Sequence, residues 1–191
     1  MSWKVWLWCG ALVLCWGCQR GRQPAGNADG AGEPGGAEKA TIRLTSEAFQ
    51  EGGLIPVEYT CAGANVSPPL AWSDVPAEAK ALALVVDDPD APRGTWVHWV
   101  VYDLPASARG LPARVPAEAA LAGGGRQGRN DFGQTAYGGP CPPGGTHRYY
   151  FKLYALNAAL NLPPGATKQE LLKAMYGHIL DQGQLMGRFR K

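Results

Sequence analysis

Two consecutive segments, Ala81-Leu-Ala-Leu-Val-Val-Asp-Asp88 and Trp96-Val-His-Trp-Val-Val-Tyr102, decide the fold of this chain. Both are rich in β-branched and aromatic residues, as is typical of strands. The connecting Pro89-Asp-Ala-Pro-Arg-Gly-Thr95 contains two prolines and a glycine, so it excludes helix and predicts a hairpin loop. In such a hairpin Asp88 and Trp96 stand about opposite each other.

Further along the chain, residues 148–156 predict another strand, and residues 41–45 and 57–60 are weaker candidates. A helix is predicted where Thr167-Lys-Gln-Glu170 has the spacing of a capping box, and the residues that follow on one face are Leu171, Leu172, Met175 and Ile179. We therefore expect a single, mainly β domain, an antiparallel sheet or sandwich with one or two helices near the C-terminus.

Polar side chains lie where these predicted strands begin or end. Side chains alternate along a strand, so one face of the first strand holds Leu82, Leu84, Val86 and Asp88, and one face of the second holds Trp96, His98, Val100 and Tyr102. His98 is then a diagonal neighbour of Asp88, at roughly 7–8 Å. A carboxylate beside an imidazole can fix its tautomer and raise its basicity. His147 and Tyr149 point the same way at the start of the later strand.

Each of these residues also has a structural interpretation. His98 and His147 can be core histidines with satisfied hydrogen bonds. Asp90, between two prolines, is as much a turn former as a site residue. His178 follows the predicted helix near its C-terminal end, where a cation is favoured, and we interpret it as structural.

The N-terminus predicts export. Residues 5–16 are apolar, follow the single charge of Lys4, and are too few for a membrane-spanning helix, so residues 1–17 are interpreted as a signal peptide. Gly17-Cys18 resembles the end of a bacterial lipoprotein signal, and Cys18 is the candidate lipidation site. Gln19 then favours the outer membrane. The alternatives are simple secretion, a soluble periplasmic protein or a retained anchor.

Composition divides the remainder into a tether and a domain. Residues 18–40 are mostly Gly, Ala, Pro and polar side chains, with almost nothing to bury, which favours a flexible tether. Residues 41–191 are enough for one domain with a core. The net charge of +2 and the scattered basic residues argue against nucleic acid or an acidic membrane surface as the partner. Membrane contact is expected only through the lipid anchor.

The cysteines are consistent with an oxidising compartment. If Cys9 and Cys15 leave with the signal and Cys18 carries lipid, Cys61 and Cys141 remain as a pair. A disulfide between them is the favoured interpretation. The alternative is two small buried thiols.

Several motifs resemble the phosphatidylethanolamine-binding protein family, in its bacterial Raf kinase inhibitor-like branch. The motifs, in order, are Ser67-Pro-Pro-Leu70, Asp88-Pro-Asp-Ala-Pro92, Trp96-Val-His-Trp-Val-Val101, Asn130-Asp-Phe-Gly133, Tyr137-Gly-Gly-Pro-Cys-Pro-Pro-Gly-Gly-Thr-His-Arg-Tyr149 and Gly177-His-Ile-Leu180. The resemblance covers the chain from about residue 41 onward. It implies a large antiparallel sheet packed on a smaller one, with a small pocket at one end.

In the family this pocket holds phosphate-like anions or the phosphoethanolamine head group. Carried over by position, the ligand-binding residues are Asp88, Asp90, His98, Gly138, Pro140, His147 and Tyr149. Imidazole and phenol donors would bind phosphoryl oxygens, and Asp88 would orient His98 or accept from an ammonium group. Animal relatives add a C-terminal helix with a pocket tyrosine that is not obvious here. Kinase inhibition, known for eukaryotic relatives, is not carried over to an exported protein.

The leading hypothesis is a non-enzymatic binding protein for a small anion or a phospholipid head group, or one that presents its pocket end to an envelope protein. A second is an inhibitor of an extracytoplasmic protease or other enzyme, acting through the loop of residues 123–145. Enzymatic versions are weaker. A metal site of Asp88, His98 and His147 lacks a short ligand spacing, and Ser67 and Ser73 lack a nucleophile motif. No catalytic residue, metal or cofactor is predicted.

Overall fold

The structure, a computed structural model, describes residues 42–191. The predicted signal peptide, Cys18 and the tether of residues 18–40 lie outside the described residues. Within the described part, no helix combines the length and the apolar composition that crossing a membrane requires.

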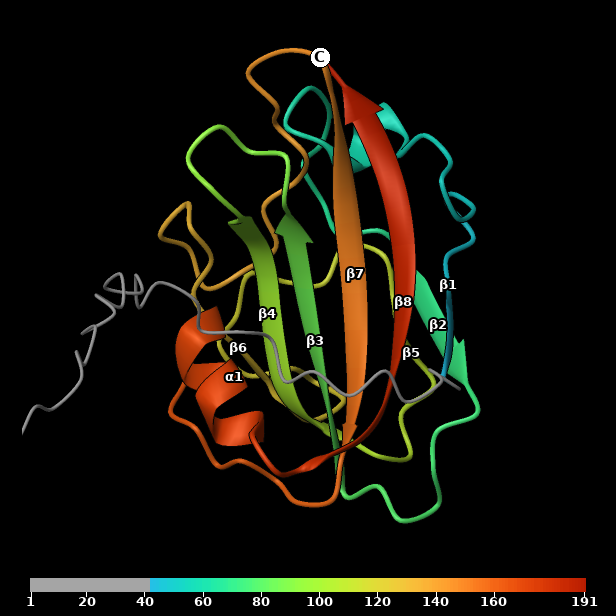
Figure 1. Cartoon of the computed structure of the whole chain (residues 1–191), viewed down its shortest axis with the longest axis vertical. Coiled ribbons are helices and arrows are strands. Elements are labelled where there is room, and N and C mark those ends of the chain that lie inside the picture. Colours follow the sequence, from blue (N-terminus) through green and yellow to red (C-terminus); the bar gives the residue numbers. More distant parts are fainter. Residues whose placement is uncertain (1–41) are drawn as a thin grey trace, which may run out of the picture. The chain divides into compact units, whose positions relative to one another are not determined.

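The larger layer is a five-stranded antiparallel sheet (Figure 1). Its strands, in spatial order, are β6 (Arg126–Gln127), β4 (Trp96–Pro105), β3 (Ala81–Asp88), β7 (Thr146–Leu156) and β8 (Ile179–Arg190). The predicted hairpin forms its centre, with Asp88 opposite Trp96 as expected. β3 is buried along its whole length because it has a strand on each side and a packed layer on each face.

The smaller layer is a three-stranded antiparallel sheet. In spatial order it contains β1 (Arg43–Thr45), β2 (Leu70–Ser73) and β5 (Gly110–Leu111). Leu44 and Trp72 of this sheet share one apolar core with Leu84, Trp99 and Phe151 of the large sheet. Each fully buried side chain of this size contributes about 1.5–3 kcal/mol. The expected architecture, a large sheet on a smaller one, is confirmed.

The opposite face of the large sheet is covered by α1 (Lys168–Met175) (Figure 1). The capping box is present: the Thr167 hydroxyl accepts from the Glu170 amide, and the Glu170 carboxylate accepts from the Thr167 amide. Leu171 and Met175 are fully buried in a second core with residues of β3, β4 and β7. The helix is a packing element, as predicted.

Two predictions for short elements are wrong. The helix ends at Met175, and Ile179 starts β8 instead of continuing the apolar face, because Gly177 reverses the chain at a φ of 77°. Residues 57–59 form a 3-10 helix, η1 (Val57–Tyr59), where a strand was a candidate. Here the Tyr59 amide donates to Pro56 and the Thr60 amide to Val57, so the segment closes on itself.

Candidate functional site

The polar residues singled out by the sequence meet at one end of the large sheet, the upper end in Figure 1. Asp88 closes β3, His98 lies near the start of β4, and His147 and Tyr149 lie at the start of β7. All four side chains are buried. We call these four residues the polar cluster.

His98 reaches this cluster through a β-bulge. Val97 pairs with Asp87 and Trp99 with Val86, so His98 is the extra residue on β4. The bulge shifts the alternation: Trp99 packs between the sheets, and Val100 lies on the helix side. The predicted common face of His98, Val100 and Tyr102 is therefore wrong, although the His98 ring does meet Tyr149, at 5.2 Å between ring centroids.

Asp88 is bonded to the other histidine, not the one predicted. Its Oδ2 accepts from His147 Nδ1 at 2.8 Å, and its Oδ1 accepts from the Asp90 amide at 2.8 Å. The His98 Nδ1 donates instead to the Gly138 carbonyl at 2.6 Å. Asp88 therefore orients His147. Asp88 meets His147 because its strand, β3, pairs with β7 in regular register. On the other edge of β3, the bulge in β4 interrupts the register beside His98.

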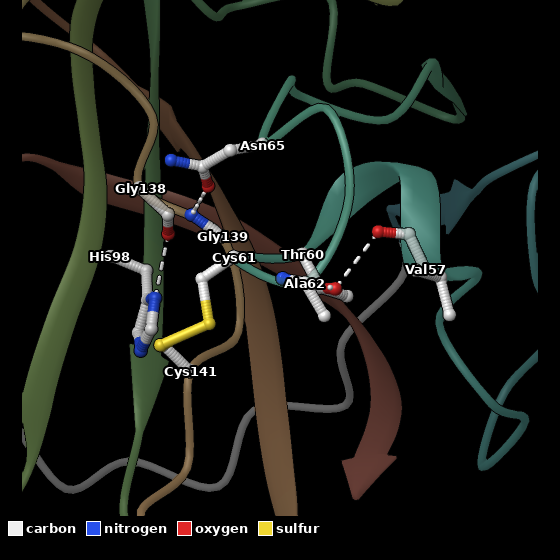
Figure 2. Close-up of a disulfide and its surroundings, with 9 residues drawn as sticks. All are labelled: Val57, Thr60, Cys61, Ala62, Asn65, His98, Gly138, Gly139 and Cys141. Carbon is white, nitrogen blue, oxygen red and sulfur yellow. Dashed lines mark hydrogen bonds between the residues drawn. A yellow bond between two sulfur atoms is a disulfide. The ribbon is translucent and has the colours of Figure 1, made fainter. Parts of the chain in front are cut away.

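These bonds fix the hydrogen positions on both imidazoles. A carbonyl or a carboxylate can only accept, so His98 Nδ1 and His147 Nδ1 must each carry hydrogen. In the neutral ring the remaining nitrogen, Nε2, is then an acceptor. In Figure 2 the His98 Nε2 is turned away from Gly138. The two imidazoles were expected to donate hydrogen bonds to a ligand. From Nε2 they can do so only when their rings are protonated.

Electrostatics favour a neutral His98. Burial lowers the pKa of His98 below 6.5, and the Gly138 carbonyl and the Asp88 carboxylate oppose this shift only in part. At neutral pH, His98 therefore presents a lone pair at Nε2. A ligand placed there must either donate a hydrogen or bring conditions that protonate the ring.

The Tyr149 hydroxyl is buried without a hydrogen bond of acceptable geometry. Burial, followed by the nearby Asp88 carboxylate, raises the pKa of this phenol well above 10, and the Cys141 backbone amide opposes the shift. The hydroxyl thus stays protonated. A buried hydroxyl without a partner costs about 1–3 kcal/mol, and a ligand that reached this oxygen would remove that cost.

The loop of residues 137–141 forms the wall beside His98. Besides accepting from the His98 ring, Gly138 donates its amide to the His98 carbonyl at 2.9 Å. Pro140 accepts from the Cys61 amide at 3.1 Å, and Cys61 is bridged to Cys141 (Figure 2). The predicted disulfide is confirmed, and its cysteines are exposed rather than buried.

Asp90 lies beside the cluster but is directed at Arg148. Its carboxylate accepts from Arg148 Nε at 2.9 Å and from Arg148 Nη2 at 2.6 Å. This ion pair holds the pKa of Asp90 at about 2. Its amide meanwhile donates to Asp88. Asp90 therefore orders the turn and helps to fix Asp88, which supports the turn-former interpretation.

A turn that was not singled out as a site element from the sequence, residues 130–136, supports His98. The buried Asn130 side chain accepts from the Gln134 amide at 2.9 Å and donates to the Ala136 carbonyl at 2.8 Å. The turn presents Phe132, which is 43% exposed, edge-on to the His98 ring at 5.3 Å. The sequence Asn130-Asp-Phe-Gly133 could have predicted this turn, because Asn and Gly are typical turn residues. In the structure Gly133 has a positive φ.

Two other site types were considered. Among residues 42–191, no group of three or more His, Cys, Asp or Glu side chains could hold a metal ion. A cavity of about 360 Å³ lies between β1, the segment that follows it and β8. Its lining residues include Arg43, Phe49 and Gln184, and none belongs to the polar cluster.

Comparison with known proteins identifies the family to which the chain is similar. The family model described as "Phosphatidylethanolamine-binding protein" matches residues 45–190. A UPF0098 protein of Methanothermobacter thermautotrophicus is 51% identical over 150 residues, covering 78% of this chain and 99% of the relative. A UPF0098 protein of Aquifex aeolicus is 45% identical over 155 residues, covering 80% and 90%.

Solved structures give the same result. A putative phosphatidylethanolamine-binding protein homolog, CT736 of Chlamydia trachomatis, is 44% identical with a TM-score of 0.73, covering 80% of this chain and 99% of that one. YbcL of E. coli, described as a member of the mammalian PEBP family, is 30% identical with a TM-score of 0.73, covering 78% and 98%. Because the family model matches residues 45–190 and relatives at 45–51% identity are covered over 90–99% of their length, the chain belongs to the phosphatidylethanolamine-binding protein family.

Proposed function

We propose that the protein binds a small phosphoryl anion, inorganic phosphate or a phosphoethanolamine head group, at the polar cluster, without chemical change to it. The observation that carries this proposal is the buried, unpartnered Tyr149 hydroxyl. This donor makes no hydrogen bond of good geometry, although the Asp88 carboxylate is near enough to act on its pKa. It lies in one cluster with two imidazoles that each use Nδ1 for a hydrogen bond within the protein. A phosphoryl oxygen is a strong acceptor that suits this hydroxyl.

The proposed complex needs one additional proton. Neutral His98 offers an acceptor at Nε2, and phosphoryl oxygens are also acceptors, so a hydrogen must lie between them. It comes either with a phosphate monoanion or from protonation of an imidazole. In either case the complex holds more protons than its separated parts at pH 8, so affinity should rise as pH falls from 8 to 6.

Binding without catalysis is favoured by the absence of a suitable nucleophile near the cluster within residues 42–191. The raised pKa of Tyr149 makes its phenol a poor one. The two serines considered from the sequence are both hydrogen-bonded elsewhere: Ser67 Oγ accepts from the Val115 amide, and Ser73 Oγ donates to Asp74. Neither serine is bonded to the His147 and Asp88 pair, and the Tyr149 phenol beside this pair is a poor nucleophile.

The test is a titration with inorganic phosphate and, separately, with phosphoethanolamine, followed by NMR of the histidine side chains at pH 6 and pH 8. We expect shifts of His98 and His147, larger at pH 6. Tyr149→Phe should weaken binding about tenfold, the equivalent of about 1.4 kcal/mol. Tyr102→Phe is the matched control, because Tyr102 is buried in the other core and its hydroxyl donates to the Pro163 carbonyl, away from the polar cluster. Unchanged histidine signals at millimolar ligand at both pH values would refute the proposal.

We also propose that the domain is exported and anchored as a lipoprotein, with the outer membrane as the favoured site. The family match begins at residue 45, so the predicted signal and tether precede it. Labelling with a radioactive fatty acid tests the anchor: wild type should incorporate label and Cys18→Ser should not. Recovery of the wild-type protein in the soluble periplasmic or secreted fraction, without label, would refute the anchor and leave simple export.

A second candidate function, inhibition of an extracytoplasmic protease or other enzyme partner, is favoured by one observation. Phe132 is exposed on a turn that the Asn130 side chain holds in place, and a rigid loop loses little entropy on docking. Inhibition measured over a panel of envelope proteases tests it, with Phe132→Ala as the loss-of-contact variant. Equal activity of every protease with and without the protein would refute it.

A further inference from the structure

The Cys61–Cys141 disulfide occupies an unusual position for a structural bridge. Both cysteines are exposed, while residues 137–140 of the adjoining loop are buried. A thiolate must reach a sulfur atom to break a disulfide, so exposure decides which bridges can exchange. Both cysteine residues of the bridge lie at the surface, which is the side from which an external thiol would approach.

The same bridge is one loop away from two residues of the polar cluster. Gly138, three residues before Cys141, accepts the His98 Nδ1 hydrogen. The Cys141 backbone amide is close enough to Tyr149 to affect the pKa of its hydroxyl. Figure 2 shows the two sulfur atoms, the His98 ring and the Gly138 carbonyl together in one view. A displacement of this loop therefore changes the surroundings of both side chains.

The loop is attached to the segment of residues 57–65 by contacts that do not need the bridge. Tyr137 Oη donates to the Tyr59 carbonyl at 2.8 Å, and the Gly139 amide donates to Asn65 Oδ1 at 2.7 Å. The Cys61 amide donates to Pro140, as described above. These neutral hydrogen bonds contribute only modestly each. After reduction the loop can stay docked for part of the time and open for the rest, so reduction loosens the wall without unfolding the sheets.

We propose that Cys61–Cys141 is a redox site that controls the polar cluster. A thiolate of an external dithiol, such as the active-site pair of a thiol–disulfide oxidoreductase, attacks one sulfur and forms a mixed disulfide, and the other cysteine leaves as a thiolate. The second thiol of the dithiol then releases the first cysteine. The dithiol is oxidised by two electrons, and Cys61 and Cys141 become thiols with two protons. The loop then loosens, His98 loses its fixed acceptor, and anion affinity falls. The last step rests on the proposed function.

The first experiment needs no ligand. The purified protein, with any cysteine other than Cys61 and Cys141 blocked by alkylation beforehand, is treated with dithiothreitol in the absence of denaturant. Mass spectrometry then maps new alkylation at Cys61 and Cys141. We expect complete reduction of the native protein and a shifted or broadened His98 Nδ1–H signal by NMR. The double variant Cys61→Ser, Cys141→Ser should give the same His98 signal as the reduced protein.

A matched control perturbs the same segment but keeps the bridge. Arg114→Ala removes the exposed ion pair of Arg114 with Glu58, and its His98 signal should equal that of oxidised wild type. A bridge that is reduced only in denaturant, or a His98 signal that is identical in the oxidised and reduced proteins, would overturn the redox proposal.

Phosphate titration of both redox states completes the test. We expect about a tenfold lower affinity in the reduced protein, comparable to the loss of one or two hydrogen bonds. If His98 responds to reduction but phosphate binds neither form, the proposed function fails and control of the cluster by the bridge stands. If phosphate binds both forms equally, control of binding by the bridge fails and the proposed function stands.

Discussion

Tyr149→Phe should stabilise the ligand-free protein, although it removes a polar atom from a packed site. The substitution deletes a single oxygen, which is buried without a hydrogen bond of good geometry, close to the Asp88 carboxylate and the Cys141 amide. In the unfolded chain the same hydroxyl is bonded to water. Folding therefore loses a hydrogen bond at Tyr149 that phenylalanine never makes.

The expected size follows from the surroundings of the hydroxyl. Leaving a buried hydroxyl without a partner costs about 1–3 kcal/mol. Against this, the oxygen makes a few van der Waals contacts worth about 0.1–0.2 kcal/mol each, which the variant loses. The net gain is about 1 kcal/mol in the free energy of unfolding. For a domain of about 150 residues this corresponds to a Tm higher by about 2–4 °C.

Tyr137→Phe provides a control of opposite sign. The Tyr137 hydroxyl is also buried, but it donates to the Tyr59 carbonyl at 2.8 Å. Its removal leaves that carbonyl without this donor, so we expect a loss of about 1–2 kcal/mol. The two variants, which make the same chemical change in one core, should thus differ by about 2–3 kcal/mol.

Urea unfolding of wild type and both variants, in a buffer free of phosphate and other oxyanions, measures this difference. Addition of phosphate should then raise the stability of wild type more than that of Tyr149→Phe, because a ligand stabilises only the state that binds it. If Tyr149→Phe destabilises the ligand-free protein as much as Tyr137→Phe does, the hydroxyl has a partner in solution. The Tyr149 hydroxyl would then not be a free donor for a ligand.

Three further predictions concern the parts that hold the site. The Cys61–Cys141 bridge joins residues 80 positions apart. Its reduction should lower the free energy of unfolding by about 4 kcal/mol, because it restores chain entropy to the unfolded state. A difference below about 1 kcal/mol between oxidised and reduced protein in urea would contradict this. Because burial lowers the pKa of His98, the unfolded chain takes up a proton first, so stability should fall as pH drops below about 6.5, by at most about 1.4 kcal/mol per pH unit. This dependence should weaken in His98→Gln, and an equal slope in the variant would show that another group is responsible. Gly139→Ala places a methyl group 2.5 Å from the Tyr59 carbonyl oxygen, whereas the methyl group of Gly144→Ala meets nothing within 4 Å. Only Gly139→Ala should therefore disturb the His98 NMR signal. An equal effect of both variants would refute this prediction.

Much of the fold was predictable because the elements at its centre have recognisable local sequence patterns. The hairpin of β3 and β4 has two apolar runs separated by a proline turn, and the capping box marks the start of α1. β8 was missed because its sequence gives no such pattern. Residues such as Asp181, Gln182 and Gly183 have weak strand preference, and the strand forms because it pairs along the whole length of β7. A preference supplied by a partner strand is not visible in the segment itself.

The sequence by itself determined the central hairpin and which polar side chains lie at the strand ends. Strand alternation and the hairpin register predicted that Asp88 lies near His98 and that His147 and Tyr149 point the same way, because both depend on neighbouring residues along the chain. The family resemblance joined these two pairs into one predicted site. Only the tertiary structure decided what each group is bonded to. The bulge at His98, the choice of His147 by Asp88 and the lone Tyr149 hydroxyl depend on the packing of distant segments, in particular the bridged loop beside Gly138. Hydrogen bonds require matched distances and angles, and these are set by atoms that meet only when the chain has folded.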